Sequence, residues 1–219
     1  MTVQEAEELF EKYFASKPRI KDFIDETHEF ATKNGYVDTL QGHRRMLRDA
    51  FSKERNIYNG AMRKSVNTII QGTGAYLTNM SLVYIDDYLR QNNKKSKIVL
   101  TVHDSIVIDC HPDEIDEVAK VSKYIMENLP IDFLFIDWEG KKARYPIKAD
   151  CEIGKNYNDM VDYDKEELDT FASLEGFVKF TKDQSKIGDH ADNDLISKEQ
   201  AEQAIAQIKA CKPAYQQMV

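Results

Sequence analysis

Residues 97–110 read KIVLTVHDSIVIDC, two short apolar runs on either side of a polar centre. The runs at residues 98–102 and 106–108 are rich in β-branched residues, which favour strands. The polar stretch between them favours a tight turn, so the pattern predicts a β-hairpin. Its tip carries His103, Asp104 and Ser105. A carboxylate held rigidly at such a tip suits a hard cation such as Mg²⁺, although a lone Asp in a turn more often serves the turn itself.

The chain ahead of this hairpin predicts two helices and a second, smaller hairpin. Thr2 followed by Glu5 is a capping-box signature, so we expect a helix to begin there. A second helix is expected to begin near Pro18 and to end at Gly35, because proline suits a first turn and glycine a C-terminal cap. Residues 36–47 then predict a hairpin-like stretch.

Longer periodic segments complete the predicted core. Residues 52–91 predict a long helical region that is interrupted once, at residues 71–74, because two close glycines weaken a helix. Residues 113–129 return to helical spacing, and residues 145–153 are a strand candidate. We therefore expect an α+β fold, in which helices pack on a small antiparallel sheet that contains the hairpin.

The character of the chain changes after residue 163. Residues 164–194 are polar and predict a solvated linker, whose Asp-rich run lacks the distal Glu of a calcium loop. Residues 197–209 then predict an amphipathic helix that docks on its own domain or on a partner subunit. The expected organisation is a main domain at residues 1–163 and a C-terminal helical appendage at residues 164–219.

Composition narrows the class of protein. Hydrophobic residues make up 42% and charged residues 31% of the 219 residues, which is enough to bury a core. No apolar stretch approaches the roughly 18 residues of a membrane helix, and no signal peptide is evident, so we expect no membrane partner. The cysteines are few, widely spaced and free of any CxxC pair, which predicts a reduced intracellular protein without a zinc site. They are Cys110, Cys151 and Cys211.

The charge is unevenly distributed. A net charge of −8 argues against a nucleic-acid partner when it is taken alone. Residues 41–100, however, contain eleven Lys or Arg and four Asp or Glu, a local charge of +7, so the other 159 residues carry −15. From charge alone, a localised electropositive surface and a set of solvated helix faces are equally good interpretations.

Three polar residues in the basic segment share one helix face. Arg63, Asn67 and Gln71 are spaced four residues apart. Together they offer hydrogen bonds to phosphates, sugars and base edges, and the following Gly72 allows a backbone or ligand to approach closely. Taken by itself, this series is better explained as the exposed face of an amphipathic helix.

The order of these motifs along the chain favours a functional interpretation over a purely structural one. The chain runs GYVDTLQGHRR at residues 35–45, NTIIQGT at 67–73, VHD at 102–104 and EIGKNY at 152–157. This series resembles the C-terminal part of family A DNA polymerases, the DNA polymerase I-like enzymes, over residues 1 to about 163. GYV-TL-G-RR, N-x-x-x-QGT and VHD in that order are jointly specific, so an unrelated α+β protein with coincidental motifs is a poor alternative.

The resemblance implies a role for each matching residue. Asp104 would bind a catalytic Mg²⁺ in the palm subdomain, and His103 would lie near the primer terminus. Arg63, Asn67 and Gln71 match the helix that contacts primer–template in the minor groove, where contacts can check pair geometry without reading sequence. Arg44 and Arg45 match an arginine motif near the template strand. The implied activity is template-directed DNA synthesis from dNTPs by two-metal nucleotidyl transfer.

The departures from the family pattern lead to a split-enzyme hypothesis. Ser105 stands where the family usually has Glu. The family's first metal-binding Asp and its nucleotide-binding fingers helix belong upstream, outside this chain. Because Met1 and the capping box suggest a genuine start, we expect a subunit of a split polymerase of bacteriophage type, in the cytoplasm of a bacterial host. A second chain would then supply the missing motifs, and other replication proteins are further candidate partners.

Two alternatives to the split enzyme remain. The chain could be a degenerate, non-catalytic module that holds DNA or scaffolds a replisome. It could also be an excised piece of an ordinary single-chain polymerase, with the same function.

Overall fold

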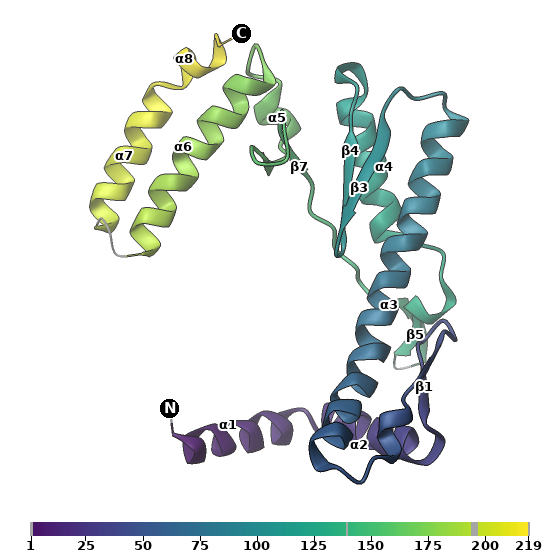
Figure 1. Ribbon diagram of the computed structural model, residues 1–219. Coiled ribbons are helices and arrows are strands. Elements are labelled where there is room, and N and C mark those ends of the chain that lie inside the picture. The colour runs from purple at the N-terminus through teal and green to yellow at the C-terminus, as the bar shows by residue number, and fades with distance from the viewer. Residues whose placement is uncertain (1, 139, 194–196, 219) are drawn as a thin grey trace. The chain divides into compact units, whose positions relative to one another are not determined.

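A computed structural model describes residues 2–138, 140–193 and 197–218 (Figure 1). Helices dominate, and the strands form four two-stranded antiparallel sheets, which confirms the α+β class. The chain divides into two compact units: the first holds Met1–His111 and Asn128–Ile147, and the second holds Pro112–Glu127 and Lys148–Val219. These units are defined by packing, so the boundary predicted near residue 163 from the change in character of the chain and the extent of the family resemblance stays a prediction.

The helices and strands of the first unit follow in chain order. They are α1 Val3–Ser16, α2 Pro18–Asn34, β1 Tyr36–Asp38, β2 Arg44–Met46, the 3₁₀ helix η1 Arg48–Phe51, α3 Arg55–Gln91, β3 Lys97–Val102, β4 Ser105–Asp109, the 3₁₀ helix η3 Asp132–Leu134, β5 Phe135–Trp138 and β6 Lys141–Arg144.

The second unit is built from the remaining elements. They are the 3₁₀ helix η2 Pro112–Glu114, α4 Ile115–Glu127, β7 Glu152–Ile153, β8 Val161–Asp162, α5 Lys165–Leu168, α6 Leu174–Asp192, α7 Lys198–Ala210 and α8 Lys212–Gln216.

The N-terminal helices form as the sequence predicts. The capping box is present, since the Glu5 amide donates to Thr2 Oγ1 at 3.3 Å and the Thr2 amide donates to Glu5 Oε2 at 2.7 Å. Helix α2 begins with Pro18 and ends at Gly35, whose φ of 73° lies in the left-handed region that favours glycine. The predicted hairpin follows as β1 and β2, with Val37 opposite Arg45.

The predicted interruption of the long helix is wrong. Helix α3 runs without a break for 37 residues, through both Gly72 and Gly74. Packing outweighs the poor helix propensity of glycine here, because the first half of α3 covers the core of the first unit. That core is small and made mostly of small or aliphatic side chains. It comprises Ala31, Val37, Leu47, Ala50, Ala61 and Met62.

The hairpin of residues 97–110 also forms as predicted. Strands β3 and β4 pair with Val102 opposite Ser105, which leaves His103 and Asp104 as the two-residue loop. A bulge between Ile98 and Leu100 shifts the register near the open end. Figure 1 shows the hairpin beside α3, against which both of its strands pack.

The strand predicted at residues 145–153 is largely wrong. Only Glu152 and Ile153 lie in a strand, β7, and Pro146 lacks the N–H that a ladder needs. A hairpin of β5 and β6 lies just before this stretch instead. Sequence pattern did not reveal it because its second strand reads Lys-Lys-Ala-Arg, which has no apolar alternation.

The linker predicted at residues 164–194 is folded in its described part. Helix α6 fills most of it and buries Phe177, Val178 and Phe180, which pack with Phe171 and with Val161 of β8. Helix α7 forms as predicted, with a Ser197–Gln200 capping box, and packs on α6. The described part of the segment after residue 163 is therefore helical and shares a core with Val161 of β8.

Candidate nucleic-acid interface

The two-residue loop at the tip of the β3–β4 hairpin presents two exposed polar side chains, His103 and Asp104. His103 has a φ of 55°, an uncommon left-handed conformation for a residue with a side chain. The Ser105 hydroxyl donates to the Val102 carbonyl at 2.9 Å and closes the turn. Within the described ranges, the Asp104 carboxylate has no hydrogen-bond or ion-pair partner. It is therefore free to bind a ligand that comes from outside the hairpin.

A groove of about 400 Å³ lies between the β1–β2 hairpin and α3. Its wall carries basic groups from both elements. The main lining residues are Thr39, His43, Arg45, Lys64, Asn67 and Gln71. The structure therefore brings Arg45 of β2 close to Asn67 and Gln71, which lie one turn apart on α3.

Close packing at the QGT motif fixes the two walls of the groove. A Cβ on Gly72 would lie 2.7 Å from Thr39 Cγ2, so only glycine lets the hairpin loop approach the helix this closely. The Leu40 amide donates to Thr73 Oγ1 at 3.3 Å, and Gln41 Nε2 donates to the Gly72 carbonyl at 3.2 Å. The close approach expected at Gly72 is thus made by the protein's own loop.

The side chains of the two predicted arginines, Arg44 and Arg45, have different hydrogen-bond partners. Arg44 donates twice to the Asp38 carboxylate, at 2.8 and 2.9 Å, and stacks 3.7 Å above the ring of Tyr36. The hydrogen bonds from Arg44 lower the pKa of Asp38. Arg45 is the next residue on the strand, so it faces the other way, towards α3. Its Nη1 donates to Thr68 Oγ1 at 3.2 Å.

The remaining predicted residues lie outside the groove lining. Arg63 is exposed on α3, and His103 and Asp104 lie on the β3–β4 hairpin. Conversely, His43, Lys64 and Thr68 line the groove and were not singled out from the sequence. The sequence could have indicated Lys64 and Thr68, because Lys64, Asn67, Thr68 and Gln71 follow the i, i+3, i+4, i+7 spacing of one helix face.

The described part of the chain offers no complete metal site. No group of three or more His, Cys, Asp or Glu side chains there is arranged to hold an ion. Asp104 fits the role of one oxygen ligand, because its carboxylate is exposed and unpaired at a fixed tip. A two-metal centre would need a further carboxylate from elsewhere.

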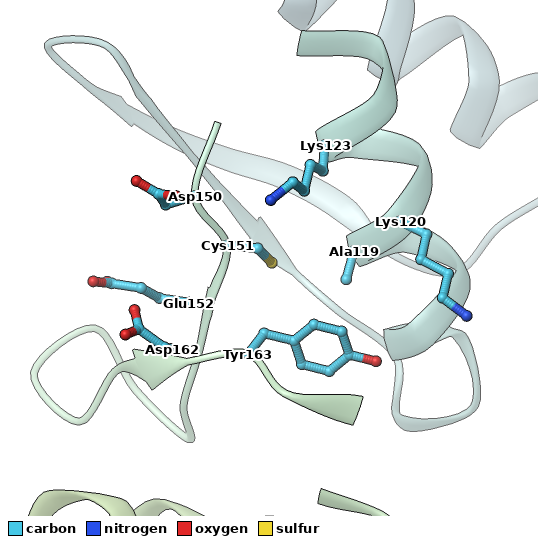
Figure 2. Close-up of a pocket in the computed structure, with 8 residues that line it drawn as sticks. All are labelled: Ala119, Lys120, Lys123, Asp150, Cys151, Glu152, Asp162 and Tyr163. Atoms are coloured by element: carbon cyan, nitrogen blue, oxygen red, sulfur yellow. The ribbon is translucent and has the colours of Figure 1, made fainter. Parts of the chain in front are cut away.

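A second hollow, of about 510 Å³, lies in the other compact unit and carries mixed charge (Figure 2). Lys120 and Lys123 reach into it from α4, but they pair with Asp116 at 3.0 Å and Glu127 at 3.8 Å. The facing wall presents three carboxylates, including Glu152 and Asp162, which are direct neighbours across the β7–β8 pair. This hollow is therefore a poor seat for a phosphate.

Tyr163 fixes the edge of that second hollow. Its hydroxyl donates to Asp116 Oδ1 at 2.9 Å. Burial, together with this bond, raises the pKa of Tyr163, so the phenol stays protonated. The pKa of Asp116 is lowered, first by its hydrogen bond from Lys120 and then by the one from Tyr163. These contacts join α4 to the end of the main domain and are structural.

The basic groove, the QGT helix and the aspartate-bearing hairpin define a polymerase-like palm fragment. In agreement, the family model for DNA polymerase family A matches residues 1–159. The chain therefore belongs to DNA polymerase family A. Within the described residues, no helix is both long and apolar enough to cross a membrane.

The chain is similar to phage and bacterial polymerases. It is 39% identical over 187 residues to the DNA polymerase of Bacillus phage SP01, a match that spans 85% of this chain and 20% of the phage protein. It is 38% identical over 125 residues to DNA polymerase I of Caldicellulosiruptor bescii, which spans 57% of this chain and 15% of that protein. The chain thus spans about a fifth or less of these relatives.

A solved structure has a similar fold. It is the POL domain of Pol1 from M. smegmatis in complex with DNA primer-template and dNTP. The TM-score is 0.56 at 27% sequence identity, over 58% of this chain and 23% of that one.

Proposed function

We propose that this chain takes part in template-directed DNA synthesis as the C-terminal portion of a family A polymerase. The observation that carries the proposal is the arrangement on α3, where a basic groove holds Arg45, Asn67 and Gln71 and a second hairpin presents the free Asp104. In this proposal the groove residues, with Arg44, Arg63 and His103, contact primer–template DNA. Asp104 holds Mg²⁺.

The proposal requires a second polypeptide segment. The catalytic centre needs another carboxylate and a binding surface for the dNTP, and the described residues contain no group of three or more His, Cys, Asp or Glu that could hold a metal ion. Helix α1 supports this requirement, because an apolar stripe on it faces solvent. Leu9, Phe10 and Tyr13 are 60%, 65% and 46% exposed. A stripe of this kind is suited to packing against further protein.

Asp104→Ala tests the catalytic role. The variant is expected to abolish primer extension by the chain combined with a segment that carries the upstream motifs, since the metal loses a ligand. Binding of the chain to primer–template is expected to change by less than about twofold, because Asp104 is negative and outside the groove. Asp109→Ala, at the other end of β4, is the matched control. If extension survives Asp104→Ala, Asp104 is not a metal ligand.

A non-catalytic DNA-binding module is the second candidate. The observation in its favour is Ser105, whose hydroxyl closes the turn and adds no charge where the family usually has a carboxylate. This candidate predicts DNA binding by the chain but no extension in any combination with an upstream segment. Extension that is lost in Asp104→Ala would exclude it.

A further inference from the structure

The groove between the β1–β2 hairpin and α3 holds Arg45 in a fixed orientation. Arg45 Nη1 donates to Thr68 Oγ1 at 3.2 Å, and the Thr68 hydroxyl donates to the Lys64 carbonyl at 2.7 Å. A hydroxyl has one hydrogen, so that second bond turns its lone pairs towards Arg45. Thr68 is only 7% exposed, so its hydroxyl is held within the fold, whereas Arg45 is exposed and accessible to a ligand. Arg45 keeps its other N–H donors for a ligand.

Lys64 supplies a second positive charge one helical turn from Thr68. Its only ion pair among the described residues is with Asp49, at 3.9 Å, and both side chains are more than half exposed. An ion pair of this length and exposure is weak. Lys64 can therefore turn to a stronger anion in the groove, with Asp49 as its competitor.

The rest of the lining favours one kind of anion. The lining residues that the structure describes include no carboxylate, and His43, Asn67 and Gln71 add hydrogen-bonding side chains. An arginine fork beside a lysine matches the oxygens of a phosphate. Amide side chains next to it suit the sugar and base edges of the attached nucleotide.

We propose that this groove seats one phosphodiester group of a nucleic-acid strand, bound by Arg45 and Lys64 and oriented by Thr68. Arg45 and Lys64 are the binding residues, whereas Thr68 acts as a positioning residue through Arg45. The inference rests on the proposed function, since it assigns particular groups to the DNA contact. It adds Lys64 and Thr68, which the motifs quoted for the resemblance do not specify.

The salt dependence of DNA binding tests this seat. Fluorescence anisotropy of a labelled primer–template duplex is measured with the full chain over a range of salt concentrations. Arg45→Met and Lys64→Met are each expected to weaken binding and to reduce the slope of log K against log salt, and together they should reduce it by about 0.9, the value for one lost phosphate contact. Lys53→Met and Arg90→Met remove the same charges elsewhere in the basic segment and are expected to leave the slope unchanged.

Three further variants distinguish a specific phosphate site from a general basic surface. Thr68→Val is expected to weaken binding and Thr68→Ser to restore it, because serine keeps the acceptor that holds Arg45. Asp49→Asn is expected to tighten binding, because it removes the competitor of Lys64. Unfolding midpoints of all variants are compared, so that a loss of fold is recognised.

The outcomes distinguish the seat from the proposed function. If the duplex binds but Arg45→Met and Lys64→Met change the slope no more than the two controls do, the seat is wrong and the proposed function stands. If the unmodified chain does not bind primer–template, both are overturned. If a dNTP alone binds in a way that Lys64→Met abolishes, the groove seats a triphosphate, and the assignment to a strand is wrong.

Discussion

At the scale of single residues, the candidate interface depends on small side chains that let larger ones approach. Gly72 lets the side chain of Thr39 pack directly against the helix backbone. Thr68 orients Arg45 through a hydrogen bond, and the Ser105 hydroxyl closes the turn that carries Asp104. None of these residues carries charge. Each instead fixes where a charged or amide side chain stands.

Gly72→Ala is expected to destabilise the chain by about 1–3 kcal/mol, the usual cost of inserting a methyl group into a packed contact. The new Cβ would lie 2.7 Å from Thr39 Cγ2, so the hairpin loop must move. The measurement is urea unfolding at equilibrium. The matched control is Gly74→Ala, where nothing lies within 4 Å and better helix propensity should stabilise by up to about 1 kcal/mol.

A second substitution checks the cause. Thr39→Ser removes Cγ2 but keeps the hydroxyl that accepts from the His43 amide at 3.0 Å. The double variant Gly72→Ala, Thr39→Ser should therefore regain most of the lost stability. Additive effects of the two substitutions would show that the Thr39 contact is not responsible.

At the scale of secondary-structure elements, the sequence predicted local structure well where caps or alternation were strong. The capping box at Thr2, the cap at Gly35 and both hairpins around α3 are confirmed. The helix break at residues 71–74 was wrong because tertiary packing overrides propensity. Hairpin β5–β6 was missed because β6 is polar on both faces.

Local sequence patterns predict the groove only in part. Asn67 and Gln71 could be predicted to share a face, since helical spacing is local. Arg45 faces these two residues, whereas Arg44 pairs with Asp38. This difference depends on the register of a three-residue strand, which no local sequence pattern specifies. Whether the predicted site residues contact DNA stays a prediction.

The C-terminal elements are expected to stabilise the end of the main domain. Phe177 is 1% exposed in a core that includes Val161 of β8. Phe177→Ala should cost about 3–5 kcal/mol, the range for a buried phenylalanine, and should open the segment near residue 163 to limited proteolysis. Lys179→Ala, on the exposed side of α6, should change stability by less than about 0.5 kcal/mol. Equal protease resistance in both variants would contradict the shared core.

Ion pairs of this module predict a pH dependence. Hydrogen bonds from Lys182, at 2.6 Å, and from Asn156 hold the pKa of Asp159 below its ordinary value of 3.8. Folding therefore favours the ionised carboxylate, so its contribution is present above pH 3.8 and is lost as the pH falls through the folded pKa. Urea midpoints between pH 5 and pH 3 should fall more steeply for the natural chain than for Lys182→Met. Parallel profiles would contradict this role of Asp159.

At the scale of the whole molecule, net charge is a poor guide to partners. The chain carries −8 in total, yet residues 41–100 carry +7 and include the groove. Length is more informative, because the chain spans about a fifth of its phage relative while its helix α1 exposes an apolar stripe. Both features support the proposal that further protein completes the polymerase active site.

Primer extension by reconstitution tests the central claim most directly. The purified chain is assayed on a primed template with dNTPs and Mg²⁺, alone and together with a polypeptide that carries the upstream family A motifs. We expect no extension from either part alone and clear extension from the mixture. Robust extension by this chain alone, or none from a mixture shown to associate, would contradict the account.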